Sequence, residues 1–249
     1  MRDAYRDREL DWARNLALCL SVLAWMALAA GQFRMAPTLC PCVGAGTIQS
    51  WSSMRMLLSA NPPISLAAGW LLMLAAMMAP ALIAPVWHIR VQSLARRRVR
   101  STALFVAGYA AVWVAAGCVL MGIEIVAQLL APAGLYAAGV VAITALIWQC
   151  SPLKQVCLNR CHAHRALCAF GAAADRDALK FGLEHGYWCV GSCWALMLFP
   201  MLLPQGHLAA MAIVGVFMWG ERIERPRSPA WRVRGIGRAL RAIGAWGTS

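Results

Sequence analysis

Six long apolar segments constrain what this chain of 249 residues can fold into. Hydrophobic residues make up 61% of the chain and charged residues only 13%, which is more apolar material than a soluble domain buries. A transmembrane helix needs about 20 apolar residues and satisfies its own backbone hydrogen bonds, whereas an isolated strand in lipid does not. We therefore predict an all-α, polytopic membrane helix bundle with about six transmembrane helices and additional interfacial amphipathic helices. The expected spans are 12–30, 66–87, 102–130, 133–149, 186–203 and 206–219.

The net charge of +13 comes from Lys and Arg residues that alternate with the expected spans. Twenty-one of these 23 residues lie before or at the start of the first span, between the second and third, between the fourth and fifth, or after the sixth, and only Arg34 and Arg55 lie in the opposite loops. Because basic loops stay in the cytoplasm, the asymmetry predicts a multi-pass topology with both termini cytoplasmic. The lipid bilayer and its anionic headgroups are the expected partners of this charge, and nucleic acid is not.

The chain is expected to form one membrane helix-bundle domain, residues 1–225, followed by a basic amphipathic cytoplasmic tail, residues 226–249. In the tail, Ile236, Leu240 and Ile243 share one helical face and arginines occupy another. This pattern is typical of a helix that lies on the inner membrane surface.

One expected span carries potential metal ligands at every fourth residue. The series is His185, Cys189, Cys193, Met197 and Met201. Residues four apart are neighbours on a helix, so each consecutive pair can share an ion. Since a helix makes one turn in about 3.6 residues, the series winds by about 40° per step, and only two or three members face one site. We predict that two or three of these residues form a metal site and that the others lead away from it along the helix.

A second set of thiols precedes this span. Ser151-Pro152 offers a capping hydroxyl and a proline at the first helical position, so a helix is expected to begin there at the cytoplasmic interface. The residues that would share one face of this helix are Cys157, Cys161, His164 and Cys168. Because Cys189 and Cys193 lie at the inner end of their span, the sulfurs of both pairs are expected within about 8 Å of one another, with His185 nearby. The alternative is that the cysteines merely fill an apolar stripe.

The ligand types indicate a soft metal. Four thiolates, or three and an imidazole, suit tetrahedral Zn²⁺, whereas two or three thiolates with methionine suit Cu⁺. The methionines favour Cu(I), with Zn(II) as the alternative. Met197 would extend the site outward, and Met73, Met77 and Met78 of the second span would face it. For each methionine a structural role is the alternative, since methionine commonly fills apolar helices.

Five motifs are spread over most of the chain: Ala76-Met77-Met78-Ala79-Pro80, Phe105-Val106-Ala107-Gly108-Tyr109, Gln149 with Ser151-Pro152-Leu153-Lys154, Cys157-Leu158 with Cys161, and Gly182 through Met197. In these motifs the chain resembles a bacterial family of predicted metal-binding integral membrane proteins, domain of unknown function 2182. The resemblance implies a multi-span protein of the bacterial inner membrane and no known reaction. The metal site that it implies consists of Cys157, Cys161, His185, Cys189 and Cys193.

The chain departs from this family pattern in two places. Ser192 stands where the family usually has a further cysteine, and His162 and His164 occupy a segment that usually reads arginine, small residue, proline. The missing thiol argues against a cage built purely from cysteine, and His164 would compensate for it.

Three classes of function remain open. The first is binding of a soft metal in metal handling, trafficking or delivery to a metal-acceptor protein, which accounts for most of the features. The second is a membrane thiol-disulfide oxidoreductase using Cys40 and Cys42, although no cysteine pair has the Cys-x-x-Cys redox spacing. The third is an accessory or assembly subunit of a larger membrane complex. The sequence shows no nucleotide-binding loop or catalytic triad, so an enzyme is not favoured.

Two acidic residues lie within the expected spans. Glu124 is toward the outer end of the third span and Glu221 is at the inner end of the sixth, and either carboxylate can be solvated there. Only Glu124 is a candidate for burial, in which case it would carry a proton or a cation.

Overall fold

The computed structural model describes residues 2–31, 63–130, 135–203 and 206–232. Every regular element in these ranges is a helix and they contain no strand, which confirms the all-α prediction. The elements are α1 (Arg2–Ala29), α3 (Pro63–Met78), η1 (Ala79–Leu82), α4 (Ile83–Gln92), η2 (Ala95–Arg97), α5 (Arg98–Leu130), α6 (Leu135–Cys150), α7 (Pro152–Cys161), α8 (Gly171–Met201) and α9 (His207–Ile223). Cys40, Cys42 and most of the predicted tail lie outside the described residues.

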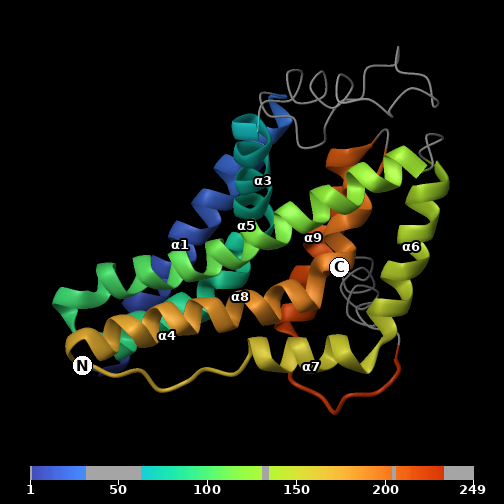
Figure 1. Cartoon of the computed structure of the whole chain (residues 1–249). Coiled ribbons are helices and arrows are strands. Elements are labelled where there is room, and N and C mark those ends of the chain that lie inside the picture. The colour runs from blue at the N-terminus through green and yellow to red at the C-terminus, as the bar shows by residue number, and fades with distance from the viewer. Residues whose placement is uncertain (1, 32–62, 131–134, 204–205, 233–249) are drawn as a thin grey trace, which may run out of the picture.

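Helices α5 and α8 form the most extensive helix pair, and they lie side by side in Figure 1. Glycines bring their backbones close together. A Cβ atom at Gly182 of α8 would lie 2.2 Å from the carbonyl oxygen of Phe105. A Cβ atom at Gly108 of α5 would lie 2.7 Å from the carbonyl oxygen of Leu179. Small residues of this kind are typical of helix contacts in membranes, where close packing takes the place of a hydrophobic driving force.

Three helical segments of the described chain are long and apolar enough to cross a membrane: Ala4–Ala29, Ala67–Gln92 and Ala95–Glu124. A fourth candidate is the pair α6 and α7, which is bent by 67°. The last two predicted spans exist as helices but do not meet the same test. Helix α8 begins at Gly171, well before residue 186, and its first half carries several charges, while α9 has only 17 residues.

The four basic segments of the sequence contact one another at one end of the helices. Ion pairs and hydrogen bonds connect the first segment to the second, the second to the third, and the third to the fourth. These contacts are Glu9 with Arg90 (2.7 Å) and Arg98 (2.9 Å), Asp175 with Arg97 (2.6 Å) and Arg100 (2.7 Å), and Asn159 Nδ2 with the carbonyl oxygen of Arg227 (2.7 Å). Segments that the charge pattern assigns to one side of a membrane are therefore neighbours in space.

Candidate metal centre

Helix α8 carries the predicted ligand series on its buried side. His185, Cys189, Cys193 and Met197 are 3%, 0%, 4% and 1% exposed. The two cysteines and Met197 belong to one hydrophobic core together with methionines of α3 and α9. The spacing of four therefore does align these side chains along one buried face, as helix geometry requires.

The cysteines of α7 pack against this face. The helix begins as predicted, because the Ser151 hydroxyl accepts a hydrogen bond from the Lys154 backbone N–H at 3.2 Å and a proline follows Ser151. Cys161 is buried in the same core and Cys157 is half-buried. A Cβ atom at Gly191 of α8 would lie 2.8 Å from Cys157 Sγ, so this thiol packs directly on α8. The two cysteine pairs lie on facing helices and not on opposite sides of the bundle.

These side chains are neighbours, but they are not arranged around a common point as the ligands of one metal ion would be. Within the ranges that the structure describes, no group of three or more His, Cys, Asp or Glu side chains is arranged to hold a metal ion. Cys193 Sγ instead donates to the backbone carbonyl of Cys189 at 2.8 Å. Binding of a shared ion would require these side chains to turn toward one another.

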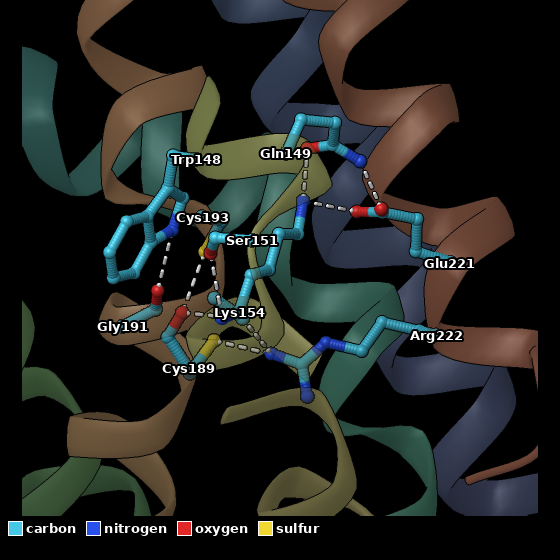
Figure 2. A network of polar contacts seen from close by, with 10 residues as sticks. Trp148, Gln149, Ser151, Lys154, Cys189, Gly191, Cys193, Glu221 and Arg222 are labelled. Atoms are coloured by element: carbon cyan, nitrogen blue, oxygen red, sulfur yellow. Dashed lines mark hydrogen bonds and ion pairs between the residues drawn. The ribbon is translucent and has the colours of Figure 1, made fainter. Parts of the chain in front are cut away.

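Arg222 of α9 is a partner of Cys189 that the sequence did not reveal. Its Nη2 donates to Cys189 Sγ at 2.8 Å (Figure 2). The same Nη2 lies 3.5 Å from the Ser192 hydroxyl, to which it also donates. The Tyr109 hydroxyl lies 3.3 Å from the same sulfur. A guanidinium and a hydroxyl both stabilise negative charge, so the surroundings of this sulfur suit a thiolate, the form of cysteine that binds metals. Tyr109 lies in one of the quoted motifs, but nothing in the sequence pairs Arg222 with a cysteine 33 residues away.

A buried polar network connects α6, α7 and α9 beside this sulfur (Figure 2). Lys154 Nζ donates to Glu221 Oε2 at 2.7 Å and to Gln149 Oε1, and Gln149 Nε2 donates to Glu221 Oε1. Lys154, Gln149 and Glu221 are 0%, 6% and 4% exposed. The prediction that only Glu124 is a candidate for burial is therefore wrong for Glu221, whose carboxylate is buried because an ammonium and an amide satisfy it. Glu124 is buried as well.

The ring of His185 lies among aromatic side chains, one turn before the first cysteine of α8. The ring centroids of Phe105, Tyr109 and Phe181 are 5.9, 6.0 and 6.0 Å away. Burial, followed by the charge of Arg222, lowers the pKa of His185 to about 3, so the imidazole is neutral. Its Nε2 is buried without a hydrogen-bond partner. A neutral imidazole with an unengaged ring nitrogen suits a metal ligand, and a buried polar atom without a partner costs about 1–3 kcal/mol.

The predicted face of α7 does not continue to His164 and Cys168, because the helix ends at Cys161. The ring of His162 explains this end, since its Nδ1 lies 2.8 Å from the carbonyl oxygen four residues earlier and engages a group that the helix leaves free. His164 lies instead beside His88, with ring centroids 4.8 Å apart. Burial, followed by the charge of His88, lowers the pKa of His164. Cys168 is exposed.

The fold and the site define a class: a helical protein with membrane-compatible apolar helices and a buried core rich in thiol and thioether side chains. A family model described as a copper chaperone, PpoB2, matches residues 67–246. The match covers most of the chain, and the chain belongs to this PpoB2 copper chaperone family. No curated protein and no solved structure shows a significant match. The family supports copper and metal handling, and the family name inferred above from the motifs stays a prediction.

Proposed function

We propose that this protein is a multi-pass membrane protein that binds Cu(I) through Cys189 and Cys193 and passes it to a metal-acceptor protein. Cys157, Cys161 and His185 complete the ligand set that becomes available as the side chains turn, with Met197 as the next ligand outward. The observation that carries this proposal is the buried face of α8, where ligand-type side chains at a spacing of four meet the cysteines of α7.

The chemistry of these side chains favours Cu(I) over Zn(II). Zn²⁺ sites are built from thiolates, imidazoles and carboxylates, whereas Cu⁺ also accepts thioethers, which surround these cysteines. The centre offers thiols, thioethers and one neutral imidazole in an apolar core. The charged side chain that contacts Cys189 is the guanidinium of Arg222, which is not a metal ligand. His164 is the ligand least supported by geometry, since it lies beside His88.

The membrane arrangement that fits the charge pattern places both termini and the four basic segments in the cytoplasm of a bacterium, against anionic headgroups of the inner membrane. The contacts between these segments support that arrangement, because segments on one side of a bilayer are free to pair with one another. The cysteines of α7 and the start of α8 would then lie near the cytoplasmic surface, within reach of a soluble or membrane-bound acceptor.

Metal analysis of purified variants tests the proposal. The chain, purified in mild detergent under reducing conditions and exposed to Cu(I), should bind copper stoichiometrically. Combined Cys189→Ser and Cys193→Ser substitutions should abolish this binding, because thiolates hold Cu⁺ more firmly than thioethers. Combined Met197→Leu and Met201→Leu substitutions should leave binding intact and alter exchange.

A matched control is available in Cys19 and Cys118, two exposed cysteines that are distant from the centre in sequence. Serine at both positions should leave copper occupancy unchanged. If the Cys189 and Cys193 double variant keeps full occupancy and cells that carry it keep unchanged copper tolerance, the cysteines are packing residues. The accessory-subunit function would then replace the copper-binding function.

A further inference from the structure

A small cavity lies where α3, α8 and α9 meet, with Cys193 in its wall. Its volume is about 10 Å³. Such a volume is close to what one water-sized sphere occupies, so the cavity fits a single ion and is too small for an organic ligand. The side chains around it that matter here are Met77, Met78, Cys193, Met218, Glu221 and Arg222.

The three methionines around this cavity come from two helices and are buried. Met77, Met78 and Met218 are 5%, 3% and 6% exposed, and they share one hydrophobic core with Cys193. The side chain of Met77 reaches α9, because its Cγ and Cε would lie 3.8 Å from a Cβ atom at Gly215, about one turn before Met218. Thioethers from α3 and α9 and a thiol from α8 therefore surround one ion-sized space.

We propose that Met77, Met78 and Met218, together with Cys193, form a transit site for Cu(I) beside the thiolate centre. This inference rests on the proposed function, since it assigns the next position of the same cargo. The ion moves by ligand exchange and remains Cu(I), so no electron donor or acceptor is involved. Cys193 supplies the one anionic ligand and the thioethers are neutral, which makes the copper-loaded site electrically neutral. Thioethers bind Cu⁺ and are poor ligands for Zn²⁺, so the site selects for copper.

Two neighbouring cavities share wall residues with this one. A second cavity beside the polar segment after α9 shares Leu158 and Glu221 with it as walls. A larger cleft of about 270 Å³ between α1, α3 and α9 shares Met77 and Trp219 with it. The methionine site therefore shares walls with a cavity lined by polar residues on one hand and with a mostly apolar cleft on the other, an arrangement that suits transfer of an ion between them.

X-ray absorption at the copper edge can detect methionine ligands directly when methionine is replaced by selenomethionine. The full chain, labelled in this way and carrying Met197→Leu so that this ligand adds no selenium signal, would be purified in mild detergent under reducing conditions. It would be loaded with two equivalents of Cu(I), because the thiolate centre fills before a thioether site. We expect a copper–selenium scattering component in this chain. Combined Met77→Leu, Met78→Leu and Met218→Leu substitutions should remove this component while copper stays bound to the thiolates.

The matched control replaces two other methionines of the same core that do not line the cavity. These are Met211, which is buried, and Met121, which packs against the core. Leucine at these positions should leave the copper–selenium component in place. If the triple cavity variant fails to fold, the single Met218→Leu variant should still reduce the amplitude of the component, because leucine matches methionine in volume.

The outcomes separate this inference from the proposed function. Copper bound without a selenium component overturns the transit site and leaves the proposed function standing. A selenium component that survives in the cavity variant, or disappears in the control, also overturns it. A chain that binds no Cu(I) overturns both.

Discussion

Separating Lys154 from Glu221 should destabilise the protein strongly, because both charges lie in its interior. The side chains are 0% and 3% exposed and their charged atoms are 2.7 Å apart. Lys154→Met keeps the aliphatic stem and removes the ammonium, which leaves the carboxylate of Glu221 with the Gln149 amide as its remaining neutral partner. Glu221→Leu leaves the ammonium of Lys154 with its hydrogen bond to the side-chain oxygen of Gln149 but without the carboxylate.

Each single substitution leaves an uncompensated buried charge, which typically costs about 3–5 kcal/mol. For a chain of this size, about 2–4 °C of melting temperature corresponds to each kcal/mol, so the apparent Tm should fall by about 6–20 °C. The double variant Lys154→Met with Glu221→Leu removes both charges and should lose less than either single variant. It should not recover fully, because the Gln149 amide then loses its hydrogen bonds to both residues, at a cost of about 1–3 kcal/mol.

Thermal unfolding of detergent-purified protein, followed by tryptophan fluorescence at one fixed heating rate, measures this effect. The matched control is Lys180→Met, which removes an exposed lysine that lies 3.9 Å from Glu184. Exposed pairs four residues apart on a helix contribute about 0.3–0.5 kcal/mol, so the control should lower the apparent Tm by less than about 2 °C. Single variants at Lys154 and Glu221 that match this control, or a double variant worse than both, would refute the reasoning.

Three further outcomes follow from local geometry. Gly182→Ala inserts a methyl into the backbone contact with α5 and should lower the apparent Tm by the equivalent of about 1–3 kcal/mol. Gly139→Ala should leave the apparent Tm unchanged, because no atom lies within 4 Å of its new Cβ. Equal effects of the two substitutions would contradict the packing account. The pKa of His185 is about 3 in the folded protein and near 6.5 in the unfolded chain. The free energy of unfolding should therefore decrease as pH falls below about 6.5, by up to about 1.4 kcal/mol per pH unit. His185→Leu should reduce this slope between pH 6.5 and 4.5. An unchanged slope would show that another group titrates. Ser151→Ala removes the cap of α7 and should cost about 1 kcal/mol, measured as a lower apparent Tm that Ser151→Asp restores.

Local patterns predicted the parts of this protein that local physics determines. The ligand series of α8 lies on one buried face because a spacing of four is set by helix geometry alone. The start of α7 was predictable because Ser151 caps the helix from within four residues. The end of α7 was not, since it depends on a side-chain contact of His162 with a carbonyl oxygen. Hydropathy likewise located α8 but not its early start at Gly171.

The parts that sequence reasoning missed depend on contacts between distant segments. Glu221 is buried because Lys154 lies 67 residues away in sequence and 2.7 Å away in space. A carboxylate at a helix end gives no signal of such a partner. The sequence contains no signal for Met218 for the same reason, because its place beside the cavity depends on residues of α3, α7 and α8. Position along one helix can be predicted from periodicity, and the approach of α7 to α8 could be predicted because the two helices adjoin in sequence. The contacts that α9 makes with them could not be predicted in this way.

Arg222 should strengthen Cu(I) binding at the thiolate centre, although it is itself a cation. A Cu⁺ ion held by two thiolates carries one net negative charge, and a guanidinium 2.8 Å from Cys189 Sγ can compensate it. Hydrogen bonds to charged groups contribute about 1.5–3 kcal/mol, which corresponds to about 10- to 100-fold in affinity.

Arg222→Met should therefore weaken Cu(I) binding by this factor in competition with a soluble Cu(I) chelator, and Arg222→Lys should restore part of it. Arg160→Met is the control, because Arg160 lies over the Trp188 ring at 5.5 Å and its removal should leave the affinity unchanged. Tighter binding in Arg222→Met would mean that the guanidinium competes with copper for the sulfur. Its role would then be to protect the empty thiolate until the metal arrives, and not to balance the charge of the loaded site.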